Sequence, residues 1–266
     1  MATQVIHLFD KIWEQYVRVT PSAKKIHQLL GGGNDVINDH VAYRTFNHPK
    51  INLTKLAQGL VKLGYSEGGQ YDFKAKKLNA KHFEHPDSTM PKVFISELKI
   101  EEFSDEVQEI ITGLIEQLPE DVSNREDFLY CGRLWQLSSS DYQTLLKVSE
   151  YAAWLAAWGY RANHFTVSIN HLANLHDIDV VNNTLKQAGY LLNTNGGEVK
   201  GNEDVKLEQS STLADKASVN FTDKAMEIPS CFYEFAKRYP MSNGKLYQGF
   251  VAASADKIFD STNVNS

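Results

Sequence analysis

This chain of 266 residues has little cysteine, no long apolar run and no excess of positive charge. Its two cysteines, Cys131 and Cys231, form no Cys-x-x-Cys pair, which argues against a disulfide framework or a cysteine zinc site and is typical of a reducing compartment. No uncharged apolar run approaches the ~18 residues of a membrane span, and the first residues lack the apolar core of a secretory signal. The formal net charge of -6 disfavours nucleic acid and acidic membrane surfaces as partners. These absences predict a cytoplasmic protein.

The sequence does contain a duplicated phrase. His40-Val-Ala-Tyr-Arg-Thr-Phe precedes a helical pattern that ends at Gly64-Tyr65. His164-Phe-Thr-Val-Ser-Ile-Asn precedes a second helical pattern that ends at Gly189-Tyr190. The spacing from histidine to Gly-Tyr agrees between the copies to within one residue, so the two copies stay in register. A duplicated unit that opens with a histidine can place two histidines symmetrically.

Hydrophobic periodicity predicts that each copy forms a strand, a helix and three further strands, which is a βαβββ module. Neither module is large enough to cover its own sheet, so we expect an α+β fold in which both modules form one curved sheet around a cavity. Two local predictions are one helix over 141–158 that ends at Gly159, and a late strand over 247–252. The chain is predicted to be a single domain of five segments: N-terminal helices over 1–38, a first module over 39–100, a helical insert over 101–160, a second module over 161–255 and a tail over 256–266.

His40 and His164 each open the first strand of a module, so a symmetric pairing would turn both imidazoles into the shared cavity. A third ligand is expected from the last strand of a module, because that strand lies beside the first. Glu97 and Glu234 both qualify, since each is an acid within an otherwise apolar strand, where an unpaired charge is costly. Two histidines and a carboxylate with open positions form the facial triad of non-haem Fe(II) oxygen chemistry. Periodicity does not choose between the glutamates, and a structural histidine or a solvent-facing glutamate is the ordinary alternative.

Arg44 follows His40 by four residues and therefore shares its face of the strand. One interpretation of Arg44 is a salt bridge to an acidic neighbour. The other is a clamp for a substrate carboxylate, which a guanidinium binds through two parallel hydrogen bonds. With a metal at one end and Arg44 at the other, the cavity would hold a short molecule with an acidic group at each end. The polar residues 209–212 either line the same cavity or face water.

At these residues the chain resembles the 2-oxoadipate dioxygenase/decarboxylase family, which has the vicinal oxygen chelate architecture. The family's metal ligands are two histidines and a glutamate, and they map onto His40, His164 and Glu234. The family's substrate-binding arginine maps onto Arg44. The chain is shorter than the family's characterised enzymes, so we expect differences in the loops that shape the substrate end. The resemblance rests on phrases spread over most of the chain: His40-Val-Ala-Tyr-Arg-Thr-Phe, Val93-Phe-Ile-Ser-Glu-Leu, Asn163-His-Phe-Thr, Gln209-Ser-Ser-Thr-Leu-Ala, Glu227-Ile-Pro and Tyr233-Glu-Phe-Ala-Lys-Arg-Tyr.

The resemblance implies an oxidoreductase that uses Fe(II), held by His40, His164 and Glu234. A 2-oxo dicarboxylic acid such as 2-oxoadipate would react with dioxygen, lose CO2 and become a 2-hydroxy acid one carbon shorter, 2-hydroxyglutarate, a step in lysine degradation. The expected partners are this small molecule and dioxygen, with no nucleic acid and no membrane, and a homo-oligomer is left open. Two alternatives stand beside this reading. One is a metal-dependent lyase, isomerase or hydrolase on the same fold, with Glu97 as a fourth ligand or base; the other is a non-catalytic small-molecule binding protein.

Overall fold

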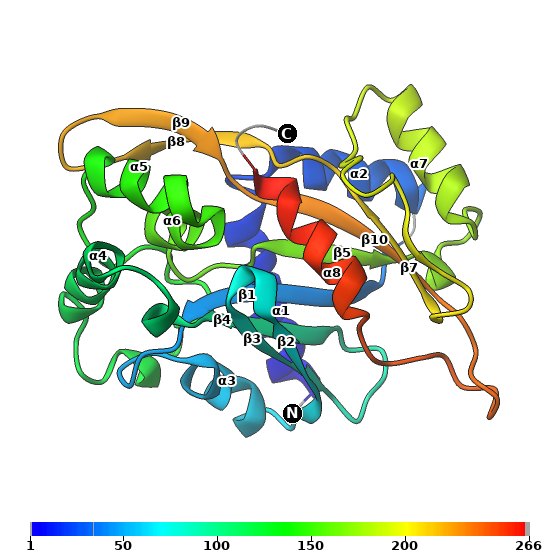
Figure 1. Cartoon of the computed structure of the whole chain (residues 1–266). Helices are drawn as coiled ribbons and strands as arrows, with labels where there is room; N and C mark the ends of the chain where they lie inside the picture. The colour runs from blue at the N-terminus through cyan, green and yellow to red at the C-terminus, as the bar shows by residue number, and fades with distance from the viewer. Residues whose placement is uncertain (1, 34, 264–266) are drawn as a thin grey trace.

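The computed structural model describes residues 2–33 and 35–263, in which helices surround one eight-stranded sheet and a separate two-stranded hairpin (Figure 1). Short 3-10 turns connect several elements, and the last of these turns, η5, follows the final helix. The elements, in chain order, are α1 (Ala2–Tyr16), α2 (Pro21–Gly31), β1 (Asn38–Phe46), α3 (Leu53–Lys62), β2 (Ser66–Phe73), β3 (Leu78–Glu84), β4 (Lys92–Leu98), α4 (Asp105–Glu116), α5 (Ser139–Val148), α6 (Glu150–Trp158), β5 (His164–Ser168), α7 (Ile178–Gln187), β6 (Lys200–Asn202), β7 (Leu207–Ser211), β8 (Lys216–Asn220), β9 (Ala225–Pro229), β10 (Phe232–Arg238), α8 (Ala252–Ile258) and η5 (Phe259–Thr262).

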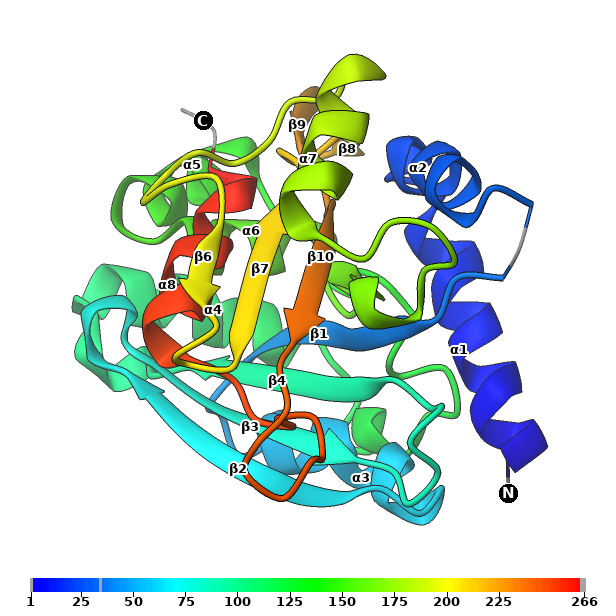
Figure 2. The ribbon, with the colours of Figure 1, turned by 90° about the vertical axis from the view of Figure 1, so that its right-hand side faces the viewer.

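The large sheet has the strand order β2-β3-β4-β1-β5-β10-β7-β6, and the two modules meet at the antiparallel pair β1–β5. In each half the last strand lies parallel to the first, β4 beside β1 and β10 beside β5. The remaining neighbours in each half are antiparallel. Figure 2 shows the resulting curvature: β4, β3 and β2 run across the view, whereas β10, β7 and β6 run up it. The predicted α+β fold of two βαβββ modules in one curved sheet is confirmed.

The duplication extends to the way the repeat helices end. Gly64 and Gly189 follow α3 and α7 with φ of +97° and +88°, in the left-handed region that favours glycine. The amide of the next residue, Tyr65 or Tyr190, then donates to the carbonyl five residues upstream, at 3.1 and 3.0 Å. This left-handed helix end satisfies carbonyls that would otherwise lack partners. The repeated Gly-Tyr pair therefore marks a repeated helix stop.

The two faces of the sheet are covered differently. On the convex face, Phe165 packs against Trp13 and Tyr16 of α1, with ring centroids 5.0 and 4.9 Å apart. On the concave face, α8 packs against β2, β6 and β7. Figure 1 shows α8, in red, crossing in front of the sheet. The concave side is therefore an interior space between the sheet and the last helix, rather than an open cleft.

Some local predictions were wrong. The expected single helix over 141–158 is two helices, because Ser149 ends α5 and its hydroxyl accepts the amide of Ala152 as the cap of α6. The expected strand over 247–252 is a loop followed by α8, and the carbonyls of Tyr247 and Gly249 accept from a guanidinium instead of a strand neighbour. Within the segment predicted as a tail, 256–266, the chain is helical as far as Thr262, and residues 264–266 lie outside the described residues. Strands β6 and β9 were not predicted.

Candidate metal centre

Strand register brings three predicted ligands together on the concave face. His40 lies opposite Thr166 across the β1–β5 junction, and Thr166 lies opposite Glu234 on β10. His164 is the first residue of β5, two positions before Thr166, and therefore lies on the same face of the sheet. One ligand atom from each of His40, His164 and Glu234 lies within 4.8 Å of the other two, and their exposed fractions are 2%, 4% and 0%. The sequence-predicted triad is thus assembled from strands of both modules.

The donor atoms converge on one point. His164 Nε2 lies 3.0 Å from Glu234 Oε2, and His40 Nε2 lies 3.6 Å from Glu234 Oε1. Gln209 Nε2 donates to Oε1 of the same carboxylate at 2.6 Å. The other oxygen, Oε2, is buried and has no hydrogen-bond partner with acceptable geometry among the described residues. A buried carboxylate oxygen without a hydrogen bond is costly, and a cation between it and the imidazoles would satisfy it.

Each histidine is oriented by the residue before it. Asp39 Oδ1 lies 2.8 Å from Nδ1 of His40, and Asn163 Oδ1 lies 3.0 Å from Nδ1 of His164. An acceptor on Nδ1 fixes the proton there and leaves the Nε2 lone pair to bind a metal. In this structure the Thr166 hydroxyl lies 3.1 Å from Nε2 of His40, at the position a metal would take. Sequence reasoning missed these two residues, although the matching Asx-His pairs in both copies were a usable signal.

The electrostatics favour the metal-binding protonation states. Burial opposes ionisation of Glu234, but the nearby His40 and His164 and the hydrogen bond from Gln209 outweigh it, so the pKa of Glu234 lies below its usual value. Burial lowers the pKa of His164, against the opposing attraction of Glu234. A carboxylate and a neutral imidazole are the forms that bind a metal ion. The residues present therefore fit a divalent transition metal.

The triad faces a small cavity of about 20 Å³ beneath α8. This volume corresponds to roughly one water molecule. Aromatic and aliphatic side chains line the space on the side away from the triad. The lining residues are His40, His164, Glu234, Gln209, Phe94, Phe250, Ala255, Ile258 and Phe259.

Glu97, the other carboxylate that the sequence offered, lies on the opposite face of the sheet. On β4 it pairs with Thr45, whereas Phe94 pairs with Ala42, two residues after His40. Glu97 Oε2 accepts the amide of Leu53 at the start of α3, at 2.9 Å. The position in the first module that matches Glu234 is therefore filled by Phe94.

Arg44 is buried, and both terminal nitrogens of its guanidinium are occupied, whereas Nε has no hydrogen-bond partner among the described residues. Its Nη1 donates to both carboxylate oxygens of Glu150 at 3.0 and 3.2 Å, and its Nη2 donates to Thr262 Oγ1 at 2.9 Å. The guanidinium also lies over the rings of Tyr151 and Trp154, at 4.8 and 5.0 Å. The salt-bridge interpretation thus describes what Arg44 does in this structure. Its role as a substrate clamp stays a prediction.

Residues 209–212 are all buried, so the polar cluster does not face water. Gln209 lines the cavity, whereas Ser210 and Ser211 bond Asn182 and Ser261.

A buried lysine on the same face was missed by sequence reasoning. Lys200 is 3% exposed and lies directly opposite Gln209 on the neighbouring strand, so both side chains share the concave face. Its ammonium donates to the carbonyls of Asn193 and Glu198, and no carboxylate in the described part of the chain lies within 4.0 Å of it. Burial lowers the pKa of Lys200 to about 8, and the nearby charge of Glu234 opposes this shift. No sequence signal marked this position, because β6 itself was not predicted.

Two paired βαβββ modules in one curved sheet, with a triad that could hold a metal ion, give the chain the vicinal oxygen chelate fold. A glyoxalase superfamily protein from Ralstonia eutropha shares the fold, with a TM-score of 0.73 at 20% identity over 91% of this chain and 84% of that chain. Within residues 2–33 and 35–263, no helix is long and apolar enough to cross a bilayer.

The chain belongs to the 2-oxoadipate dioxygenase/decarboxylase family, an enzyme family whose sequence pattern matches residues 2–123 and 120–245. The chloroplastic 2-oxoadipate dioxygenase/decarboxylase of Arabidopsis thaliana is 33% identical over 93% of this chain and 74% of its own length. The crystal structure of the Oryza sativa hydroxyglutarate synthase in complex with 2-oxoadipate has a TM-score of 0.90, with 31% identity over 97% of this chain and 92% of that chain. A Shewanella frigidimarina protein with the provisional description of a hydrolase is 61% identical, with a TM-score of 0.91 over 94% of this chain and 98% of that chain.

Proposed function

We propose that this chain is an Fe(II)-dependent dioxygenase that decarboxylates a 2-oxo dicarboxylic acid, such as 2-oxoadipate, to a 2-hydroxy acid, such as 2-hydroxyglutarate, in lysine degradation. The observation that carries the proposal is the buried triad of His40, His164 and Glu234, with ligand atoms within 4.8 Å of one another, in a member of this family. The 2-oxoadipate in the rice relative's crystal structure supports a 2-oxo diacid as the substrate class.

The protein's own residues would hold and shield the reacting groups. When bound, iron would supply the oxygen chemistry and a binding point for the 2-oxo acid, because a facial triad leaves coordination positions open. Gln209 holds Oε1 of Glu234 and thereby fixes the carboxylate. The rings of Phe94, Phe250 and Phe259 exclude bulk water from the cavity.

The second carboxylate of the substrate needs a cation. We propose Arg44 for this role, because it shares the face of His40 and is buried. Its guanidinium would have to exchange Thr262 or Glu150 for the substrate carboxylate. Lys200 is a second buried cation on this face. It lies on β6, at the far end of the second module's half of the sheet from Arg44 on β1.

The direct test uses protein purified anaerobically without metal. After addition of Fe(II) and 2-oxoadipate, we expect oxygen uptake and CO2 release in equal amounts and a product one carbon shorter. The Glu234→Gln variant should lose this activity, whereas the Glu97→Gln variant should keep it, because Glu97 lies on the other face. No oxygen consumption with any 2-oxo diacid of five to seven carbons would overturn the proposal.

The relative that is described as a hydrolase keeps a metal-dependent hydrolase as the second candidate. Turnover of an ester or amide under anaerobic conditions with Zn(II) or Mn(II) would favour it, and a metal-dependent lyase or isomerase would also react without oxygen. A protein that binds diacids but converts none would be the non-catalytic alternative. The cytoplasmic location and any homo-oligomer stay predictions.

A further inference from the structure

The two histidines of the triad have supports of different charge. The acceptor on Nδ1 of His164 is the neutral amide of Asn163, whereas the acceptor on Nδ1 of His40 is the carboxylate of Asp39. A carboxylate on the remote nitrogen makes an imidazole a stronger ligand and holds it more firmly than an amide does. The two histidines occupy matching positions in the two modules, but they are therefore held by groups of different charge.

A β-bulge lies at the support of His40. Asn38 pairs with Val167 and His40 with Thr166, so Asp39 is an extra residue on β1 without a partner across the junction. Adjacent residues of a regular strand point to opposite faces. At the bulge, Asp39 bonds the ring of its own neighbour, His40, as Asn163 bonds the ring of His164 in the second copy. Bulges of this kind redirect side chains beside functional sites.

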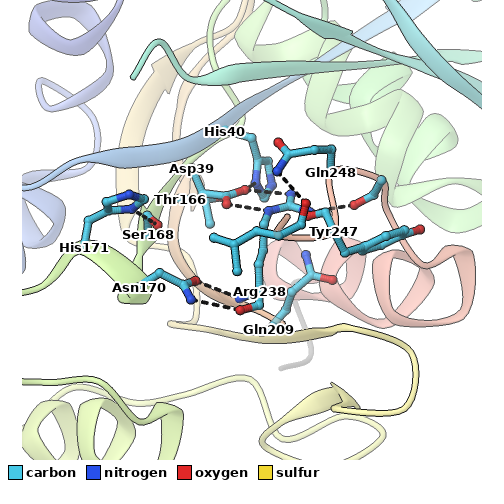
Figure 3. Close-up of polar contacts among 12 residues, drawn as sticks. Asp39, His40, Thr166, Ser168, Asn170, His171, Gln209, Arg238, Tyr247 and Gln248 are labelled. Carbon is cyan, nitrogen blue, oxygen red and sulfur yellow. Dashed lines mark hydrogen bonds and ion pairs between the residues drawn. The ribbon is translucent and has the colours of Figure 1, made fainter. Parts of the chain in front are cut away.

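Asp39 is in turn clamped by Arg238 at the end of β10. Arg238 Nε donates to Oδ2 at 2.6 Å and Nη2 donates to Oδ1 at 2.9 Å, a bidentate pair (Figure 3). The two residues are 7% and 3% exposed, and they are separated by 199 positions in the chain. Arg238 is itself fixed, because its amide and carbonyl both bond the side chain of Asn170.

The remaining donor of Arg238 reaches the segment that closes the cavity. Its Nη1 donates to the carbonyls of Tyr247 and Gly249 at 2.9 and 2.8 Å, and its guanidinium lies 5.2 Å from the ring centroid of Phe250. The Phe250 ring meets the His40 ring edge-on, with centroids 4.8 Å apart, and it lines the cavity directly before α8 begins. The guanidinium of Arg238 therefore contacts both Asp39, which supports His40, and the segment 247–250, which closes the cavity.

We propose that Asp39 and Arg238 are positioning residues, which fix His40 as the more strongly held imidazole ligand and tie it to the cavity-closing segment 247–250. This proposal rests on the proposed metal site. Its chemistry requires the bidentate, planar guanidinium, because a lysine ammonium could not satisfy Asp39 and two carbonyls in the same geometry.

The test compares Co(II) binding by the metal-free protein and by variants, with Co(II) as a spectroscopic probe. The double variant Asp39→Asn/Arg238→Met removes both charges together, so no buried charge is left without its partner. We expect its dissociation constant for Co(II) to rise about 10- to 100-fold, with an altered Co(II) absorption spectrum. The matched control is Asp72→Asn/Lys99→Met. It removes a surface ion pair, in which Lys99 Nζ lies 2.8 Å from Asp72 Oδ1, at a place remote from the triad, and it should leave both the Co(II) affinity and the spectrum unchanged.

Arg238→Lys is the second variant, and it carries the test if the double variant does not fold. It keeps the positive charge but lacks the several fixed N–H donors of the guanidinium. We therefore expect weaker Co(II) binding and faster amide hydrogen exchange over 247–250. Wild-type Co(II) affinity and spectrum in a folded variant, with unchanged exchange, would overturn the proposal and leave the pair with a structural role only. Failure of the wild-type protein itself to bind Co(II) would instead overturn the metal site, so the two failures are distinguishable.

Discussion

His164 lies opposite Ala42 across the junction of the two modules, and not opposite His40. The two histidines are thus offset by two residues along antiparallel strands, which keeps both on the same face of the sheet. Their ring centroids lie 5.6 Å apart at an interplanar angle of 83°. An offset of one residue would have sent one imidazole to the convex face, so this register is what allows a shared metal ion.

Removal of a ligand should strongly lower metal retention without unfolding the protein. Glu234→Gln and His164→Ala should lower the retained Fe(II) or Co(II) by at least about tenfold, because each removes one of three donors. Metal content after dialysis, with thermal unfolding of the same samples, provides the measurement. Glu97→Gln is the control, since that carboxylate lies on the other face and bonds Leu53. Equal metal retention in all three variants would contradict the assigned triad.

Arg44→Met should destabilise the protein by about 3 kcal/mol, because it leaves the partly buried Glu150 carboxylate without its partner. The double variant with Glu150→Gln should recover part of that loss, and a double-mutant cycle of unfolding free energies measures the coupling.

The same variants test the proposed clamp. Affinity for 2-oxoadipate relative to the monoacid 2-oxohexanoate should fall in the folded Arg44→Met/Glu150→Gln protein loaded with Zn(II). An unchanged preference for the diacid would reduce Arg44 to its structural salt bridge and would point to Lys200 instead.

Lys200 should give the stability a distinctive dependence on pH. Its pKa in the fold is about 8, below the usual lysine value near 10.5, so the folded state binds fewer protons than the unfolded state between these values. Stability linked to Lys200 therefore rises with pH across that window, and the cost of the buried charge is fully present below about pH 8.

Lys200→Met should be more stable than the wild type at pH 7, by about 1 kcal/mol, since the lost hydrogen bonds offset part of the relief from desolvation. The gain should shrink as the pH rises from 8 toward 10, as measured by urea unfolding at each pH. Lys216→Met, at an exposed position, is the control and should show no such trend. A difference that is constant with pH would refute this assignment.

The small cavity predicts that substrate entry requires movement of α8. About 20 Å³ cannot hold a six-carbon diacid, and Ile258 and Phe259 close the space. Ile258→Ala should weaken the cover and speed association of 2-oxoadipate with metal-loaded protein in stopped-flow experiments. Ile111→Ala is the matched control, because it removes an equally buried side chain from α4, an element outside the cavity wall. If both variants bind at the wild-type rate, α8 is not the barrier to entry.

Periodicity within single elements explains which parts of the fold were predictable. Apolar spacing and the repeated Gly-Tyr helix ends are local features, and the structure has them where the sequence indicates. The side-chain caps of α3 and α7, Asn52 and Asp177, are equally local. Errors arose where a side-chain contact overrode local pattern. Ser149 splits an apolar helical run with its own cap, and Arg238 holds the carbonyls of a segment that reads as a strand.

The sequence by itself determined that two histidines recur at matching places in two modules, and alternation along β1 placed Arg44 on the face of His40. Periodicity left the carboxylate open and the family resemblance pointed to Glu234; the tertiary structure added the reason, because strand pairing sets Glu234 beside Thr166 and gives the matching position in the first module to Phe94. Only the tertiary structure joined Asp39 to Arg238, across 199 residues, and placed α8 over the triad. The physical reason is the sequence separation of the interacting residues. Helices and strand faces follow from residues close together in the chain, whereas a site built from both modules depends on the register between distant strands, which no local pattern encodes.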